Sequence, residues 1–172
     1  MAASVRPLSR PVTGPAPRPG TADPPRTVSA GQLHLAALAS APFWGRQYTR
    51  LFLADCPGIT EDTAETAQLI VSELVTNAVR ASGCDLSGRE PSYSQRTGAG
   101  VIRLSLRRLR DGLLIEVSDA SPGSPLFVRA GREGRDTEHG RGLMLVDALC
   151  EDWGYYPAPR RGKVVYAFLS LA

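Results

Sequence analysis

The stretch from Ile70 to Ala81, IVSELVTNAVRA, has the spacing of an amphipathic helix. At 100° per residue its apolar positions form one stripe, made of Ala67, Ile70, Val71, Leu74, Val75 and Ala78. Glu73 and Asn77 lie one helical turn apart along one border of this stripe. The pattern predicts a helix that buries its apolar stripe and presents a carboxylate and an amide at the edge of the buried contact.

This polar pair has two interpretations. Asn77 offers a carbonyl oxygen, a ligand that suits a hard cation such as Mg²⁺, and Glu73 could orient or deprotonate a water or a hydroxyl group. In the structural interpretation, the two residues only border the core and hydrogen-bond to each other or to Arg80. The helix by itself does not decide between the two.

Length and charge limit the class of protein. With 172 residues, 42% of them hydrophobic, the chain is long enough for one domain with a buried core. The net charge of +3 arises in the first thirty residues, and the remainder carries 16 basic and 16 acidic residues. Arg103, Arg107, Arg108 and Arg110 cluster at a spacing that, on a strand, predicts a solvated face. We therefore expect no direct contact with nucleic acid.

The cysteines and lysines exclude several kinds of site. Cys56, Cys84 and Cys150 are an odd number without CxxC spacing, which argues against a disulfide framework or a zinc site and for a reducing compartment. Lys163 is the only lysine, so there is no GxxxxGK[ST] phosphate loop. Because no apolar run reaches membrane-spanning length and no signal-peptide core is present, we expect a cytoplasmic protein without membrane contact.

The chain before the polar pair divides into a tail, a strand and two helices. Residues 1–30 hold seven of the fourteen prolines, which predicts a disordered tail before a domain at 31–172. Partial alternation predicts a strand over 32–39. A first helix is expected from Pro42 until Pro57, and Thr60 is the expected N-cap of the second helix, which ends at Gly83.

A polar loop over 84–100 precedes a predicted β-hairpin. Its strands, 102–107 and 113–117, alternate apolar and polar residues around a turn at 110–112. The period of two carries Asp119 onto the apolar face at the end of the second strand. A buried carboxylate needs hydrogen-bond donors. Two kinds of donor fit: a backbone turn at Ser121, or the exocyclic amino group of an adenine.

The last part of the chain combines a glycine-rich segment, a helix and two strands. Residues 120–139 have the composition and length of a flexible lid. Gly140, Arg141 and Gly142 directly precede an apolar helical run, LMLVDALC. Backbone N–H groups at such a helix start can bind an anion, although a flexible helix entry explains the same glycines. Strands are expected at 153–156 and 164–171, around a turn at 157–162.

Several motifs of this sequence, in their order and spacing, resemble the ATP-binding domain of gyrase B subunits, MutL and histidine kinases. These motifs are ELVTNA, VSDASPGSP, GRGLMLVDAL, and WG followed by GKVVYAFL. Over about 35–171 the sequence is most similar to the anti-sigma factor serine kinases. The resemblance implies an α+β Bergerat fold, a two-layer α/β sandwich whose mostly antiparallel, mixed sheet has helices packed on one face. Two positions differ from the family pattern. Asp119 is followed by ASPGSP instead of the DxGxG spacing, and Gly162, Lys163 and Val164 stand where some members place Thr or Ser.

The resemblance also implies ATP and Mg²⁺ as cofactors, with a role for each matched residue. It implies that Asn77 helps to coordinate Mg²⁺, that Glu73 is the polarising base and that Asp119 binds the adenine amino group. The further residues implied to contact the nucleotide are Gly123, Gly140, Arg141, Gly142 and Leu143.

The function implied is that of a regulatory serine/threonine protein kinase. Such a protein phosphorylates a small antagonist of the anti-anti-sigma type and, in another complex, sequesters a sigma factor. Homodimerisation through the face near the first helix is also implied, and the aromatic residues of that helix, Phe43, Trp44 and Tyr48, fit either such a contact face or the core. The alternative is a catalytically silent, nucleotide-gated protein-binding module of the same fold. The presence of Glu73 favours the kinase, because binding alone needs no base.

Overall fold

The computed structural model describes residues 12–13, 27–84, 92, 94, 98–121, 141–159 and 161–171. In chain order, the strands and helices of this part are β1 (Val12–Thr13), β2 (Thr27–Ala36), α1 (Ala41–Ala54), α2 (Glu61–Ala81), β3 (Val101–Leu109), β4 (Gly112–Asp119), α4 (Arg141–Leu149), β5 (Asp152–Pro157) and β6 (Lys163–Ser170).

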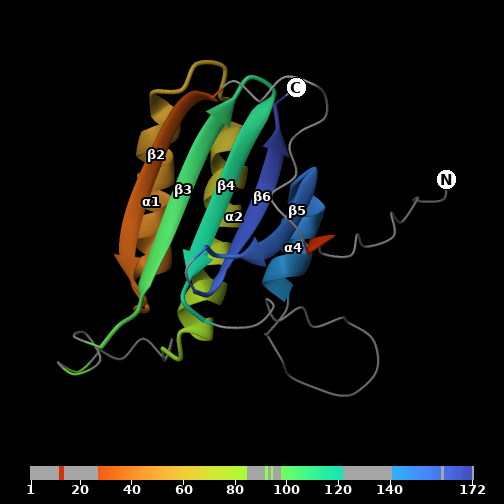
Figure 1. The fold of residues 1–172 in the computed structure, drawn as a ribbon. Helices are drawn as coiled ribbons and strands as arrows, with labels where there is room; N and C mark the ends of the chain where they lie inside the picture. Colours follow the sequence, from red (N-terminus) through yellow and green to blue (C-terminus); the bar gives the residue numbers. More distant parts are fainter. Residues whose placement is uncertain are drawn as a thin grey trace.

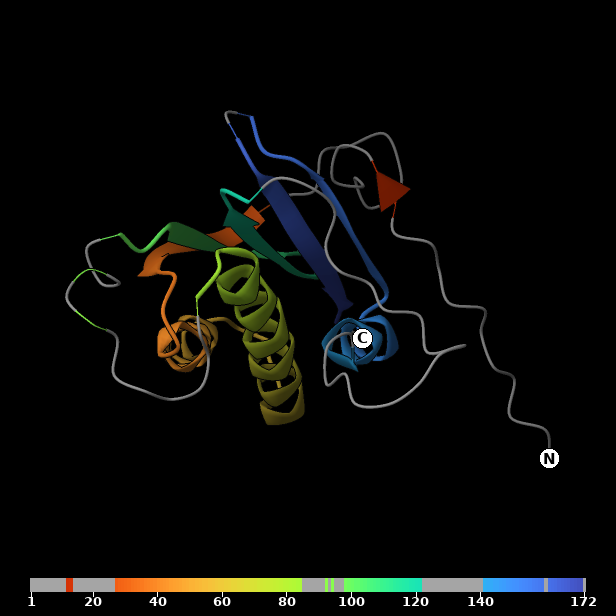
Figure 2. The ribbon, with the colours of Figure 1, turned by 90° about the horizontal axis from the view of Figure 1, so that it is seen from below.

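The strands of the described residues form one sheet in the order β1-β5-β6-β4-β3-β2 (Figure 1). All neighbouring strands are antiparallel except β1 and β5, which are parallel. Viewed along the sheet, α1, α2 and α4 lie together on one of its faces (Figure 2). The predicted α+β sandwich with a mostly antiparallel, mixed sheet is therefore confirmed.

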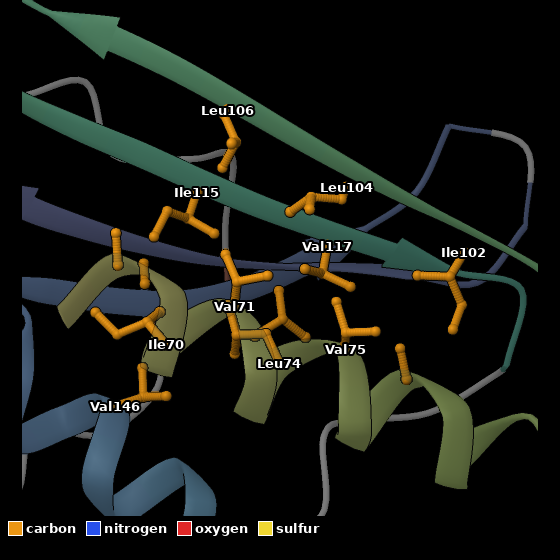
Figure 3. Close-up of a cluster of buried hydrophobic side chains, with 14 of the residues drawn as sticks. Ile70, Val71, Leu74, Val75, Ile102, Leu104, Leu106, Ile115, Val117 and Val146 are labelled. Atoms are coloured by element: carbon orange, nitrogen blue, oxygen red, sulfur yellow. The ribbon is translucent and has the colours of Figure 1, made fainter. Parts of the chain in front are cut away.

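The apolar stripe of α2 forms the centre of the core between the helices and the sheet. All of its predicted members are buried, and they pack against apolar residues of the central strands (Figure 3). On β4 these partners include Ile115 and Val117. Because alternate residues of a strand face the same side, Asp119 follows them onto the helix-facing side at the end of β4.

The ends of α2 form where the sequence predicts them. Thr60 is the N-cap, and its hydroxyl oxygen accepts a hydrogen bond of 3.2 Å from the Thr63 N–H. Gly83 follows the helix with φ of +76°, a left-handed conformation that favours glycine.

Among the described helices, none has the length and apolar character needed to cross a membrane.

Helix α1 buries Ala41, Gly45, Thr49 and Leu53 and exposes two of its aromatic residues. A Cβ atom added at Gly45 would lie 3.1 Å from Val71 Cγ1, so α1 approaches α2 closely at this glycine. Phe43 and Trp44 are instead exposed and contact each other edge to face. Tyr48 is partly buried and packs against the core.

The first strand of the domain differs from the prediction at both ends. Strand β2 begins at Thr27, inside the segment predicted to be a tail, and ends at Ala36 rather than at residue 39. The tail was predicted from composition, but residues 27–30 extend the edge strand by pairing with the end of β3. After Ala36 the chain turns, and the Ala37 N–H donates to the Gly100 carbonyl. Tertiary pairing with β3 therefore decides the bounds of this strand.

Candidate functional site

Glu73 and Asn77 both lie on α2 at the border of its buried stripe, where each is partly exposed. The structural interpretation required them to hydrogen-bond to each other or to Arg80. No such hydrogen bond is found within the described part of the chain. The two side chains are therefore placed at the edge of the core without being joined to one another.

The start of α4 lies directly against Glu73. A Cβ atom added at Gly142 would overlap the Oε2 atom of Glu73, so a larger residue here would force the Glu73 carboxylate to move. Helix α4 begins at Arg141 and packs against α2. The N-terminal turn of a helix has a positive electrostatic potential and points its N–H groups outwards. The candidate base and the candidate phosphate-binding segment are therefore adjacent.

The other residues predicted to contact the nucleotide are described to different extents. The side chain of Leu143 is buried in the hydrophobic core, so a contact from this residue to a ligand would have to use its backbone. Gly123 and Gly140 lie outside the described residues, as do most of the predicted loop at 84–100 and lid at 120–139. Arg141 is described only as the first residue of α4.

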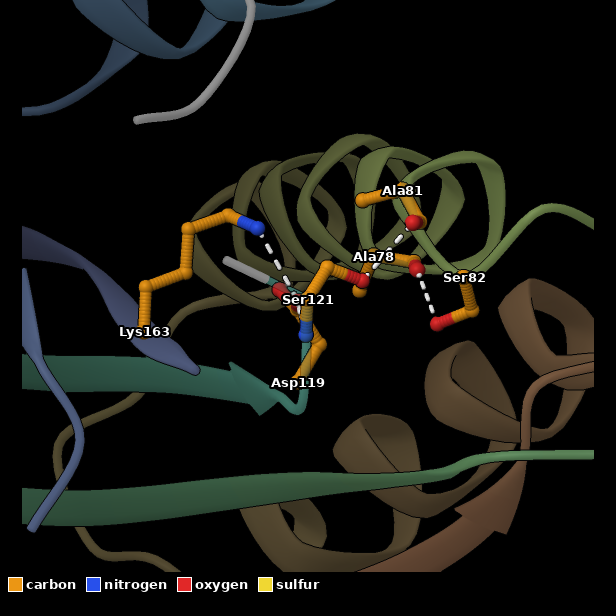
Figure 4. Close-up of polar contacts among 6 residues, drawn as sticks. All are labelled: Ala78, Ala81, Ser82, Asp119, Ser121 and Lys163. Carbon is orange, nitrogen blue, oxygen red and sulfur yellow. Dashed lines mark hydrogen bonds and ion pairs between the residues drawn. The ribbon is translucent and has the colours of Figure 1, made fainter. Parts of the chain in front are cut away.

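The carboxylate of Asp119 is buried and receives two hydrogen bonds on the same oxygen (Figure 4). The Ser121 backbone N–H and the Lys163 Nζ each lie 2.9 Å from Asp119 Oδ1. The turn at Ser121 expected under the structural interpretation is thus present. The ion pair with Lys163 was not predicted, and both side chains are nearly inaccessible, with 1% and 7% of their surfaces exposed.

Strand register explains why Lys163 lies beside Asp119, because the two residues are paired directly opposite each other on β6 and β4. Directly opposed residues of antiparallel strands point to the same face. Gly162, just before it, has φ of +88°, and a Cβ atom there would overlap the Asp119 carbonyl oxygen. The tight turn that only glycine permits therefore sets Lys163 beside the carboxylate.

A second contact joins the end of β4 to α2. The hydroxyl of Ser121 donates a hydrogen bond of 2.7 Å to the Ala81 carbonyl oxygen, in the last turn of α2. Glu73, Asn77 and Ala81 follow one another at intervals of four residues. At the rise of an α-helix, Glu73 and Ala81 are about 12 Å apart along the axis. One side of α2 therefore carries the contact with α4 at Glu73 and the contact with the Asp119 turn at Ala81, and Asn77 lies between them.

Two tyrosines with raised pKa values lie on the other side of the sheet. Burial raises the pKa of Tyr156, and its hydrogen bond of 2.6 Å to Glu116 raises it further. Glu116 also forms an ion pair with Arg107, so this arginine of the predicted solvated face is only partly exposed. Burial and the nearby Asp152 likewise raise the pKa of Tyr166. These shifts concern groups outside the candidate site.

Comparison with protein families shows which family the chain belongs to. The chain matches the family described as the histidine kinase-like ATPase domain over residues 36–168, which include Glu73, Asn77, Asp119, Gly142 and Lys163. The chain belongs to this family. As a histidine kinase-like ATPase domain it is expected to bind ATP, in agreement with the resemblance seen in the sequence. No curated protein matches the chain.

The residues present fit a nucleotide bound with a cation better than a cation held by protein alone. Within the described part of the chain, no three His, Cys, Asp or Glu side chains gather as metal ligands. Asn77 offers one amide oxygen, while Mg²⁺ takes six oxygen ligands and keeps substrate phosphates and waters among them. A cation here would therefore draw most of its ligands from a bound nucleotide and from water.

Proposed function

We propose that this protein is an ATP-binding regulator of the anti-sigma type, a serine/threonine kinase that phosphorylates a small antagonist protein of the anti-anti-sigma type. The main support is the contact between Glu73 and Gly142, which sets a carboxylate beside the N-terminal turn of a helix. Helix starts of this kind bind phosphate groups. A carboxylate at that position is suited to accept a proton from a group that attacks the terminal phosphate.

In the proposed reaction, a serine hydroxyl oxygen of the antagonist forms a bond to the γ-phosphorus of ATP. The bond between this phosphorus and the oxygen that bridges to the β-phosphate breaks, and ADP leaves. Glu73 accepts the proton of the hydroxyl group. Phosphoryl transfer of this kind depends mainly on positioning and on stabilisation of charge, for which the contact between α2 and α4 is suited.

A cation is needed because the site brings like charges together. The Glu73 carboxylate lies where phosphate oxygens would bind, and their repulsion opposes binding. Mg²⁺, when bound, would neutralise charge on the phosphates. Asn77, one turn after Glu73, would hold it through its amide oxygen.

The protein partners belong to the same proposal. Besides the antagonist, these are a sigma factor and a second copy of this chain. Phe43 and Trp44 are exposed on α1, and Leu51 of the same helix is exposed as well. Exposed apolar groups of this size support a protein contact on this helix. Sedimentation of the wild type and of Trp44→Ala would show whether the contact is made between two copies.

Transfer of labelled phosphate from ATP to a candidate antagonist protein tests the catalytic role. Glu73→Gln keeps the size of the side chain and removes the base, so we expect the transfer rate to fall by about 10² to 10⁴, with ATP binding retained. Glu65→Gln, which changes an exposed glutamate of the same helix, is the matched control and should transfer phosphate like the wild type.

Three outcomes separate the candidate functions. Transfer that depends on Glu73 supports the kinase. Equal transfer by the wild type and Glu73→Gln would show that Glu73 is not the base. A wild type that binds ATP and the antagonist but never labels it would instead be the silent, nucleotide-gated binding module.

A further inference from the structure

The only lysine of the chain, Lys163, is buried in an ion pair with Asp119. Lysine is among the residues least often buried, because its ammonium group loses hydration. Here it lies at the sheet end, beside the carboxylate that is expected to bind the base of the nucleotide. An ion pair needed only for stability would not have to lie at this point.

The hydrogen-bonding capacity of Lys163 exceeds what its partner uses. An ammonium group has three N–H donors. Among the described residues, one acceptor is found for Nζ, the Asp119 Oδ1 at 2.9 Å. The ammonium group therefore has donors to offer to a further acceptor that enters the site.

The second oxygen of Asp119 is equally suited to a ligand. Both hydrogen bonds that the described residues donate to this carboxylate reach Oδ1, one from Ser121 and one from Lys163. Oδ2 is therefore left to accept a hydrogen bond from a ligand, to which Lys163 Nζ could donate. The site presents an acceptor and a donor side by side.

This pair is complementary to the edge of an adenine. The exocyclic amino group of adenine is a donor, and the ring nitrogens on either side of it, N1 and N7, are acceptors. An acceptor from Asp119 and a donor from Lys163 match the amino group and one neighbouring ring nitrogen.

We infer that Lys163 is a base-recognition residue, which donates a hydrogen bond from Nζ to a ring nitrogen of adenine while Asp119 accepts from the amino group. The inference rests on the proposed binding of ATP. The competing role is that of a plug, which neutralises Asp119 in the free protein and leaves when the nucleotide enters.

Calorimetry with modified nucleotides tests the contact at the level of single atoms. ATP is compared with 1-deaza-ATP and 7-deaza-ATP, each of which keeps the amino group and replaces one ring nitrogen by a carbon. We expect the wild type to bind one of the two analogues about 10- to 100-fold more weakly than ATP. This is the loss of affinity expected when one hydrogen bond from a charged donor is removed. Equal affinity for all three nucleotides overturns the inference without any variant.

Two variants complete this comparison. Lys163→Met should bind ATP itself about 10- to 100-fold more weakly and should no longer discriminate against the deaza analogue. Arg161→Met, which removes an exposed cation two residues away, is the control and should behave like the wild type. A Lys163→Met variant that keeps the full discrimination overturns the inference, because a merely structural lysine would weaken all nucleotides equally.

The single lysine also allows a direct measurement on the wild-type protein. Acetic anhydride acylates amines, and mass spectrometry separates Lys163 from the N-terminal amine. We expect Lys163 to react slowly without nucleotide and no faster with ATP, because it stays buried in both states. Faster acylation with ATP, together with tighter binding by Lys163→Met, would identify the plug. No binding of ATP by the wild type would overturn the proposed function and this inference together.

Discussion

Gly142, at the start of α4, lies directly against the carboxylate of Glu73, near the middle of α2. These residues are far apart in the sequence, and α2 and α4 meet at this point. A side chain at residue 142 would require the Glu73 carboxylate to move. The contact also places the N-terminal end of α4, which has a positive electrostatic potential, beside the Glu73 carboxylate. This electrostatic interaction is favourable. A candidate base is thus held where phosphate would be bound.

Gly142→Ala should slow phosphate transfer to the antagonist by about tenfold, equivalent to about 1.4 kcal/mol, because the new methyl group displaces the carboxylate of Glu73, the proposed base. The labelled-phosphate transfer assay on the purified variant measures this loss. Gly100→Ala is the control, since a Cβ atom there would make only an ordinary contact of 3.9 Å with Ser82 Oγ. Equal loss in both variants would show that the effect is not specific to the contact with Glu73.

Asn77→Ala should remove the dependence of ATP affinity on Mg²⁺. We expect affinity in the presence of Mg²⁺ to fall about tenfold, as for the loss of a ligand worth about 1.4 kcal/mol, and affinity in EDTA to stay unchanged. Gln68→Ala serves as the control, because among the described residues its amide bonds within its own helix, to the Ala64 carbonyl. If Asn77→Ala responds to Mg²⁺ like the wild type, Asn77 is not a ligand of the cation.

Ser121→Ala should lower the free energy of unfolding by about 0.5–1.5 kcal/mol, because it removes the hydrogen bond from the Ser121 hydroxyl to the Ala81 carbonyl. The backbone N–H that donates to Asp119 is kept. Urea denaturation measures the difference. Ser170→Ala, at an exposed position at the end of β6, is the control and should lower the free energy of unfolding much less. Similar values for the two variants would mean that the bond to α2 contributes nothing to stability.

The thiol of Cys150 should resist alkylation at alkaline pH. Burial raises its pKa from 9.0 to about 12, and the negative charges of Asp147 and Asp152 add to the effect. Since the thiolate is the reactive form, iodoacetamide at pH 9 should modify Cys150 about two to three orders of magnitude more slowly in the folded protein than in urea. Mass spectrometry of the peptides gives the rate for this site. Equal rates in both states would exclude the raised pKa.

The same shift makes a stability prediction with a definite sign. The folded state holds the Cys150 proton up to about pH 12, whereas the unfolded thiol loses it near 9.0. This contribution to stability is therefore complete below pH 9 and is lost as the pH rises from 9 towards 12. Cys150→Ala should show a smaller fall in unfolding free energy over that interval than the wild type. A fall of the same size would contradict the assignment.

Much of the fold could be predicted because its elements are strongly periodic. The buried stripe of α2, the cap at Thr60 and the hairpin that carries Asp119 follow from local spacing alone. The start of β2 could not be predicted, since residues 27–30 become a strand only by pairing with the end of β3. Their composition resembles that of the tail before them, and backbone pairing is not visible in composition.

The sequence by itself determined which residues are chemically able to form the site: a carboxylate and an amide one turn apart, an aspartate on the buried face of a strand, and glycines before a helix. Local periodicity is sufficient for this, because it decides which face of an element each side chain occupies. Only the tertiary structure decided that Gly142 contacts Glu73 and that Lys163 is the partner of Asp119. Both contacts join elements distant in sequence, and they depend on helix packing and on strand register, which no local pattern contains.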